Sequence, residues 1–420
     1  MTIPPRAIQL LGEATLERFL RYVRVDTRSV PDTGSHPSSP GQRELADILK
    51  TELTEMGIAD TEIDGFSYLY ARLPASPGAS ETPLTLCAHL DTSPSVSGSG
   101  VTPVLHPNYD GTPIRFSKSP EMTLTPADSP ELLRFLGDTI ITAAGDTLLG
   151  ADDKAGIAAI MGALAALRAF PELPHPELRI VFTPDEEIGE GADHIQMDRL
   201  GRIGYTVDGG EMGSIEEECF HAEEIALHFT GHNVHPGYAK NRMVNAGAAA
   251  ARFAAALPDH DTPEHREGRE GFVHLTSIAG DESEADLTLI LRDFQDEKVT
   301  ERREFIQLLV ETFTARTPGL KIGMTIKEQY RNMKEVLAQH PEVMARALEA
   351  ITSAGLSPIP KPIRGGTDGA RLSFMGMPTP NLFAGGMLFH SPKEWIPATA
   401  LRKSAETLLH LCRLWAEPGS

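Results

Sequence analysis

Histidine and carboxylate side chains stand at the ends of several apolar, strand-like runs of the sequence, where they could bind metal ions together. His89 closes the run TLCAH, and Asp91 follows it by two residues. The other candidates end runs of the same kind, and they are Asp152, the pair Glu186 and Glu187, Asp208, and His390. Mixed imidazole and carboxylate ligands suit zinc, or manganese or cobalt, whereas calcium and magnesium prefer oxygen alone. The pattern predicts a two-metal hydrolase.

Each of these residues also has an ordinary structural interpretation. His89 and Asp91 point to the same face of a strand, so Asp91 is placed to fix the His89 ring, but a core histidine beside a turn aspartate would look alike. Asp152 opens an Ala-rich helix, where aspartate is a common N-cap. Beside the other candidates, Asp152 becomes a carboxylate that could bridge two cations.

Glu186 and Glu187 follow the run LRIVFT through a Thr-Pro turn. Two adjacent acids on a loop are usually solvated. A metal-dependent hydrolase, however, needs one carboxylate as a ligand and another that is free to act as a general base. The adjacent pair can supply both.

The elements that must position these residues alternate between strand and helix. A helix over 154–170 precedes the strand LRIVFT, a short helix over 192–198 and the strand IGYTV. A helix over 335–354 and a final helix over 399–415 complete this part. Continuous apolar strands between helices predict an α/β fold, with a doubly wound sheet covered on both faces and ligands at the carboxyl ends of the strands.

Residues 220–330 follow a different order, which reads strand, helix, strand, strand, helix, strand. This βαββαβ order is typical of a ferredoxin-like unit. The simplest organisation is a first domain split by an insertion. We expect a catalytic domain formed by 1–219 and 332–420, with the inserted domain over 220–331.

Composition narrows the class of protein. The formal charge of −21 argues against nucleic acid or an anionic membrane as the main partner. The cysteines are few, odd in number and widely spaced, which predicts reduced thiols in the cytoplasm; they are Cys87, Cys219 and Cys412. No signal peptide or membrane span is predicted. His36 lies in the Pro- and Ser-rich segment 29–41, where we interpret it as a solvated loop residue.

Several motifs resemble the peptidase T (aminotripeptidase) branch of the di-zinc aminopeptidase, carboxypeptidase and aminoacylase family. They are HLD, GADDKAG, TPDEEIG, VDGG, GHNVHPGYAKNRMVNA, LRDF, IRGGTDGARLSFMGMPTPNLF and LFHS. The likeness runs from the first helix to the last. One departure is the proline-rich segment SPKEWIPA after the last histidine, which puts the shape of that loop in doubt.

The resemblance implies two zinc ions per subunit, for which cobalt or manganese could substitute. It implies Glu186 as the general base, Asp91 as the residue that orients His89, and a bridging role for Asp152. It also implies that the inserted domain is a lid that mediates homodimer formation. The implied metal ligands are His89, Asp152, Glu187, Asp208 and His390.

Four further residues are implied to bind substrate, and each has a plain alternative. His235 would polarise the scissile carbonyl, although a histidine beside a turn proline is ordinary. Asn245 would contact substrate, although it is also placed as a helix N-cap. Arg292 or Arg364 could clamp a carboxylate in a bidentate pair, although exposed arginines are often only surface residues.

The leading hypothesis is an aminopeptidase that removes the N-terminal residue from tripeptides, using a metal-bound hydroxide and Glu186 as the base. A deacylase or carboxypeptidase on the same scaffold is the alternative. A metal-binding or peptide-binding protein without turnover is a third possibility, but a pure binder has no need of Glu186.

Overall fold

Parallel strands form the centre of a large mixed sheet in the computed structural model, which describes residues 3–417. The eight strands lie in the order β1-β2-β8-β3-β9-β16-β10-β15. Their bounds are β1 (Asp60–Ile63), β2 (Leu69–Leu73), β8 (Leu178–Thr183), β3 (Leu84–His89), β9 (Ile203–Gly209), β16 (Asn381–Phe383), β10 (Ser214–Glu218) and β15 (Ile359–Pro362). The four central strands are parallel and their outer neighbours β2 and β10 are antiparallel, so the predicted mixed α/β class is confirmed.

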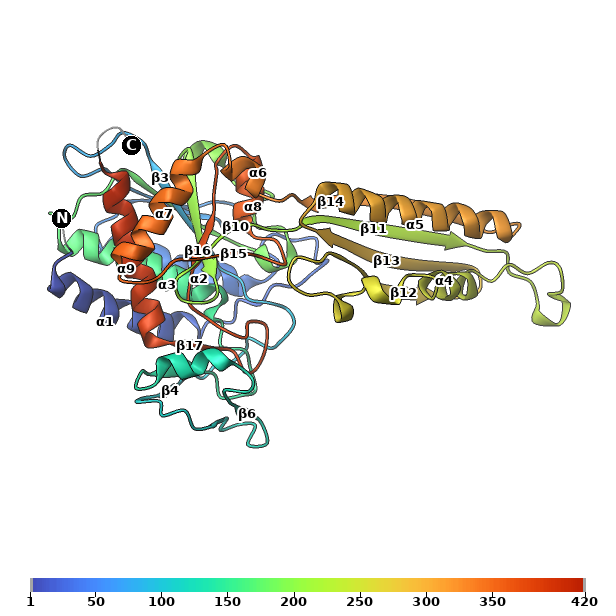
Figure 1. Ribbon diagram of the computed structural model, residues 1–420, viewed down its shortest axis with the longest axis horizontal. Coiled ribbons are helices and arrows are strands. Elements are labelled where there is room, and N and C mark those ends of the chain that lie inside the picture. The colour runs from blue at the N-terminus through green and yellow to red at the C-terminus, as the bar shows by residue number, and fades with distance from the viewer. Residues whose placement is uncertain (1–2, 418–420) are drawn as a thin grey trace. The chain divides into compact units, whose positions relative to one another are not determined.

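The Ala-rich helix α3 (Ala151–Ala169) packs against β3 and β9, and Figure 1 shows α1 (Pro5–Tyr22) and α9 (Ala398–Trp415) beside it. Its small residues let neighbouring elements approach closely. Cys87 and Val181 of the sheet pack in another buried cluster with Leu372, which lies on α8 (Asp368–Phe374). The strands are apolar throughout because both neighbouring layers bury them.

The other α-helices of this part are α2 (Pro40–Glu55), α6 (Lys334–Leu337) and α7 (Pro341–Ser353). One small sheet consists of β4 (Val104–His106), β7 (Ile140–Thr142) and β17 (Trp395–Pro397). A second consists of β5 (Ile114–Arg115) and β6 (Thr123–Leu124). Among the described residues, no helix is long and apolar enough to cross a membrane. The cysteines are all free, as predicted, and the structure also buries all three.

A second compact unit comprises residues 218–332 together with 363–366. Its antiparallel sheet has the order β12-β13-β11-β14, and the chain order of its elements is βαββαβ. The bounds are β11 (His221–Thr230), α4 (Ala246–Ala254), β12 (Phe272–Gly280), β13 (Glu284–Asp293), α5 (Asp296–Arg316) and β14 (Lys321–Tyr330). Alternate residues of β11, including Ile225, Leu227 and Phe229, enter its core. Residues 363–366 were not part of the predicted insertion.

Three local predictions were wrong. The helix expected over 335–354 is two helices, because Pro341 begins α7 and the residue before a proline is held out of the helical conformation. The helix expected over 192–198 is only a 3₁₀ turn, Met197–Arg199. The side chain of His36 is not solvated, since only 8% of it is exposed.

Candidate metal centre

The candidate ligands gather at the carboxyl edge of the central strands. His89 is the last residue of β3, and Asp208 lies near the end of its neighbour β9. The pair Glu186 and Glu187 opens the 3₁₀ turn η2 (Glu186–Ile188), which begins three residues after β8 ends. Asp152 lies in the first turn of α3. Because parallel strands share one carboxyl edge, residues far apart in the chain meet there.

Asp152 lies between the two imidazoles. Its Oδ1 is 2.9 Å from His89 Nε2, and its Oδ2 is 3.1 Å from His390 Nε2. Each imidazole also faces a second carboxylate. Asp208 Oδ1 is 3.5 Å from His89 Nε2, and Glu187 Oε2 is 2.9 Å from His390 Nε2. The five side chains therefore form two half-sites that share Asp152.

Without a cation these groups compete for protons. Burial, together with the charge of Asp152, raises the pKa of Glu187 to about 7 and that of Asp208 to about 8. Hydrogen bonds to Asp152 and Glu187 raise the pKa of His390 to about 10. Bound protons reduce the repulsion between the neighbouring carboxylates. A cation that bound the same oxygen and nitrogen atoms would displace those protons.

The donor set fits a pair of divalent cations. Glu187 Oε1 is buried and has no hydrogen-bond partner among the described residues, although buried carboxylate oxygens are normally bonded. Imidazole nitrogen combined with carboxylate oxygen suits divalent transition metals, and each half-site holds both types.

Asp91 links His89, at the end of β3, to the turn η2 that carries Glu186 and Glu187. Its carboxylate is fully buried and accepts hydrogen bonds from the backbone N–H groups of Glu186 (3.0 Å) and Glu187 (3.1 Å). Its Oδ1 also lies 3.3 Å from His89 Nδ1. Asp91 is thus placed to fix both the ring of one candidate ligand and the backbone of another.

The Glu186 carboxylate forms no hydrogen bond or ion pair with any residue that the structure describes, in contrast to that of Glu187. Burial raises the pKa of Glu186 well above its ordinary range, against the opposing effect of His89. A half-buried, unpaired carboxylate beside a candidate metal centre is the arrangement that a general base needs.

Two acids that sequence reasoning overlooked hold the backbone of this centre. Asp153 accepts hydrogen bonds from the N–H groups of His89 (3.2 Å) and Gly156 (3.1 Å), so Asp153 bonds the first turn of α3 and leaves Asp152 free for the cluster. Glu394 is buried, and it accepts hydrogen bonds from four successive N–H groups over 149–152 at 2.7–3.2 Å. The sequence offered one signal for the role of Glu394, which is that this charged residue directly precedes the apolar strand Trp395–Pro397.

Two of the predicted substrate-binding residues are exposed on the second unit. His235 Nδ1 accepts a hydrogen bond from Gly237 N at 3.1 Å, and its ring lies against Tyr238. Asn245 is the N-cap of α4, with its Oδ1 accepting from Ala248 N at 2.7 Å. The capping role of Asn245 is therefore present, and substrate binding by either residue stays a prediction.

The two arginines bond within the same unit. Arg292 is 9% exposed and donates to the carbonyls of Glu223 and Leu291 and to Gln329 Oε1. Arg364 is half-buried and donates to the carbonyls of residues 266, 268 and 270. The role of a carboxylate clamp stays a prediction for both.

Known proteins resemble this chain over most of its length. Residues 148–414 match the pattern of the peptidase family M20/M25/M40. The peptidase T of Parabacteroides distasonis is 45% identical over 402 residues, which cover 96% of this chain and 98% of that protein. The crystal structure of aminopeptidase PepT from Bacillus cereus has a TM-score of 0.73 at 22% identity, and covers 97% of this chain and 99% of its own.

A tripeptidase structure from Staphylococcus aureus has a TM-score of 0.74, also at 22% identity, and covers 96% of this chain and 98% of its own. At that level of identity the two structures show a shared fold, whereas the relative that is 45% identical shows a closer likeness along nearly the whole chain. The chain therefore belongs to the peptidase family M20/M25/M40, within its peptidase T branch.

Proposed function

We propose that this protein is a metal-dependent aminopeptidase that removes the N-terminal residue from tripeptides. The observation that carries the proposal is Asp152, which lies between two imidazoles at one end of the sheet, with the unpaired Glu186 on the adjoining turn. The names peptidase T and tripeptidase, which similar proteins bear, support the substrate class.

Two zinc ions would be held by His89, Asp152, Glu187, Asp208 and His390. Such cations lower the pKa of water and polarise a peptide carbonyl. Glu186 takes a proton from the attacking water and delivers it to the amine that leaves. Asp91 keeps the His89 ring and the Glu186 backbone in place during that transfer.

Recognition of both ends of the peptide would select substrates of a fixed length. The free amine meets the carboxylates of the metal centre, and the carboxylate end meets Arg364 or Arg292. Of these two, Arg364 is the more exposed. His235 polarises the scissile carbonyl, and Asn245 contributes to substrate contact in addition to its capping bond.

A peptide panel tests the substrate class. Ala-Ala-Ala is assayed beside its C-terminal amide, its N-acetyl form, a dipeptide and a pentapeptide. Free Ala-Ala-Ala should be the best substrate. Amidation should cost a few kcal/mol, roughly the range for leaving a buried charged partner unpaired. Equal rates for the N-acetylated and free peptides would favour the alternative, a deacylase or carboxypeptidase.

Chelation tests the metal requirement. Removing the cations should abolish activity, and zinc, cobalt or manganese should restore it, because the crowded carboxylates otherwise bind protons. Metal analysis of protein purified without added metal identifies the ion. Full peptidase activity in a thoroughly demetallated sample would contradict the proposal.

We also propose a cytoplasmic homodimer that joins through the inserted domain. The outer strand β14 and the helix α5 expose Ile326 (46%) and Leu308 (59%), which supports the assembly. The three buried thiols are compatible with a reducing compartment. Sedimentation of the active enzyme tests assembly. If His235 acts in the partner's site, mixing His235→Ala with Glu186→Gln protein should restore activity, and an active monomer would exclude action in trans.

A further inference from the structure

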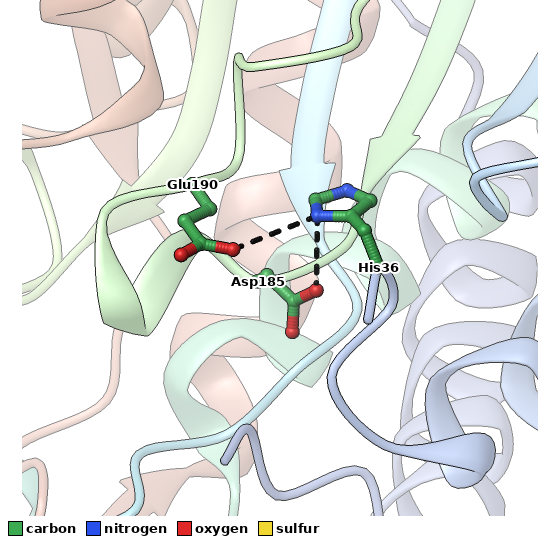
Figure 2. A group of neighbouring side chains, drawn as sticks. All are labelled: His36, Asp185 and Glu190. Carbon is green, nitrogen blue, oxygen red and sulfur yellow. Dashed lines mark ion pairs between the residues drawn. The ribbon is translucent and has the colours of Figure 1, made fainter. Parts of the chain in front are cut away.

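A second group of histidine and carboxylate side chains lies outside the five-residue centre. His36 comes from the loop between α1 and α2, while Asp185 and Glu190 flank the turn η2. Figure 2 shows that His36 Nδ1 points towards both carboxylates. Neither the peptidase chemistry proposed above nor the sequence motifs assign a role to this group.

The distances between the three candidate ligand atoms are close to those around a shared cation. His36 Nδ1 is 3.3 Å from Asp185 Oδ2 and 3.8 Å from Glu190 Oε2. The longer distance exceeds that of a hydrogen bond. Ligand atoms around a tetrahedral zinc ion, with bonds of about 2.0–2.2 Å, stand roughly 3.3–3.6 Å apart. The three candidate atoms all lie within 4.8 Å of one another.

The His36 ring is held in one orientation. It stacks on Tyr68 at 5.6 Å between ring centroids, and the rings of His194 and Phe66 meet it edge-on at 4.9 and 6.0 Å. Nε2 is buried and has no hydrogen-bond partner within residues 3–417. The ring packing therefore keeps Nδ1 directed at the two carboxylates. The His36 side chain would need little further ordering to bind a cation.

The Asp185 carboxylate is also fixed. Oδ1 accepts hydrogen bonds from Ser38 Oγ (2.5 Å) and Gln42 Nε2 (2.6 Å), and Oδ2 accepts one from Ser38 N (2.8 Å). A carboxylate offers about four lone-pair positions, so one position on Oδ2 remains and faces His36. Hydrogen bonds of this type orient metal-binding carboxylates.

The charge of the pair is not balanced by a basic side chain. Among residues 3–417, no lysine or arginine forms an ion pair with Asp185 or Glu190. The guanidinium of Arg371 bonds the Gly189 carbonyl, but it pairs with Asp193 instead of Glu190. The Glu190 side chain is 45% exposed, which gives an ion and its water ligand a route of entry.

We propose that His36, Asp185 and Glu190 form an additional site for a divalent transition-metal cation such as zinc, separate from the five-residue centre. Water completes the coordination on the exposed side. The bound ion joins the loop of His36 to the turn that carries Glu186 and Glu187, and so stabilises that turn.

The test is a difference in zinc stoichiometry between variants. Demetallated full-length protein is dialysed against buffered zinc, and bound zinc per chain is measured by mass spectrometry. His36→Phe keeps an aromatic ring against Tyr68 but removes the ligand, and Glu190→Gln weakens an exposed ligand with little effect on folding. His194→Phe is the matched control, because that exposed histidine contacts the rings of His36 and Phe66 without belonging to the ligand group.

The wild type and His194→Phe should bind one zinc ion more per chain than His36→Phe, and Glu190→Gln should bind that ion more weakly. Zinc should also raise the melting temperature of wild type above the rise seen for His36→Phe. Equal stoichiometry in wild type, His36→Phe and Glu190→Gln would overturn the proposal. The measurement uses no peptide, so failure of the aminopeptidase assignment would leave this difference unchanged.

Discussion

At the scale of single residues, Glu186 and Glu187 are neighbours with different surroundings. Glu187 meets His390, whereas the Glu186 carboxylate has no partner among the described residues. Glu186→Gln keeps the shape of the side chain but removes its basicity. Turnover of Ala-Ala-Ala should fall roughly 10²–10⁴-fold while metal content stays near that of wild type.

Glu187→Gln is the comparison for that prediction. It should lower metal affinity first, because it changes the carboxylate that faces His390. Both variants are assayed for turnover and for zinc content after dialysis. If Glu186→Gln is the variant that loses zinc, the two roles are assigned the wrong way round.

Glu394 should act on metal affinity through the backbone. Its carboxylate accepts the N–H group of Asp152 and those of the three residues before it. In Glu394→Gln, an NH₂ group replaces one of the two carboxylate oxygens. This group is a donor, so it cannot accept the hydrogen bonds that the lost oxygen accepted. Zinc affinity, measured by competition with a chelator, should weaken roughly 10–100-fold, as for other residues that orient ligands.

Glu406→Gln provides the control for this change, because Glu406 is also buried but pairs with Arg402 and Lys403 within α9. Its zinc affinity should match that of wild type. Unchanged affinity in Glu394→Gln would show that the backbone bonds are not needed to place Asp152.

At the scale of elements, close approach of α3 to β9 depends on Gly156. A Cβ atom there would lie 1.8 Å from the carbonyl oxygen of Val207, next to Asp208 in β9. Gly156→Ala must therefore separate helix and strand, and should lower the free energy of unfolding by about 1–3 kcal/mol. It should also weaken zinc binding, because the two elements carry Asp152 and Asp208.

Gly162→Ala tests whether any added methyl on α3 has this effect. Its Cβ would meet Thr15 Oγ1 at 2.3 Å, and a side chain can rotate where a backbone carbonyl cannot. Urea unfolding and zinc titration of both variants should give the larger loss for Gly156→Ala. Equal losses would contradict the argument from backbone contact.

At the scale of the whole molecule, His410 should make stability depend on pH. Burial, with the nearby charges of Arg413 and Lys403, lowers the pKa of His410 to about 4 from an ordinary value of 6.5. Between these pH values the unfolded chain binds a proton that the folded chain refuses. Stability is therefore unaffected by this group above pH 6.5, and falls by about 1–3 kcal/mol as the pH approaches 4.

His410→Gln should remove that part of the pH dependence, and His260→Gln, which changes an exposed histidine, should leave it intact. Urea midpoints measured from pH 7 to pH 4 compare the three proteins. A His410→Gln profile parallel to that of wild type would contradict the assignment.

The sequence by itself determined the elements and the types of ligand. Apolar runs with strand or helix periodicity act over a few residues, so the parallel strands, the βαββαβ order and the acids and histidines at the strand ends are readable locally. Pro341 was readable in the same way, and the break between α6 and α7 could have been predicted from it.

Only the tertiary structure decided which groups meet. Glu394 reaches the backbone of residues 149–152 across more than 240 positions of sequence, and Asp185 holds a segment nearly 150 positions away. His36 does lie in a loop, but the solvent exposure expected for it was wrong because nothing local encodes the aromatic rings that bury it. Local patterns fix conformation, but burial and the direction of a carboxylate depend on contacts that form when distant segments pack together.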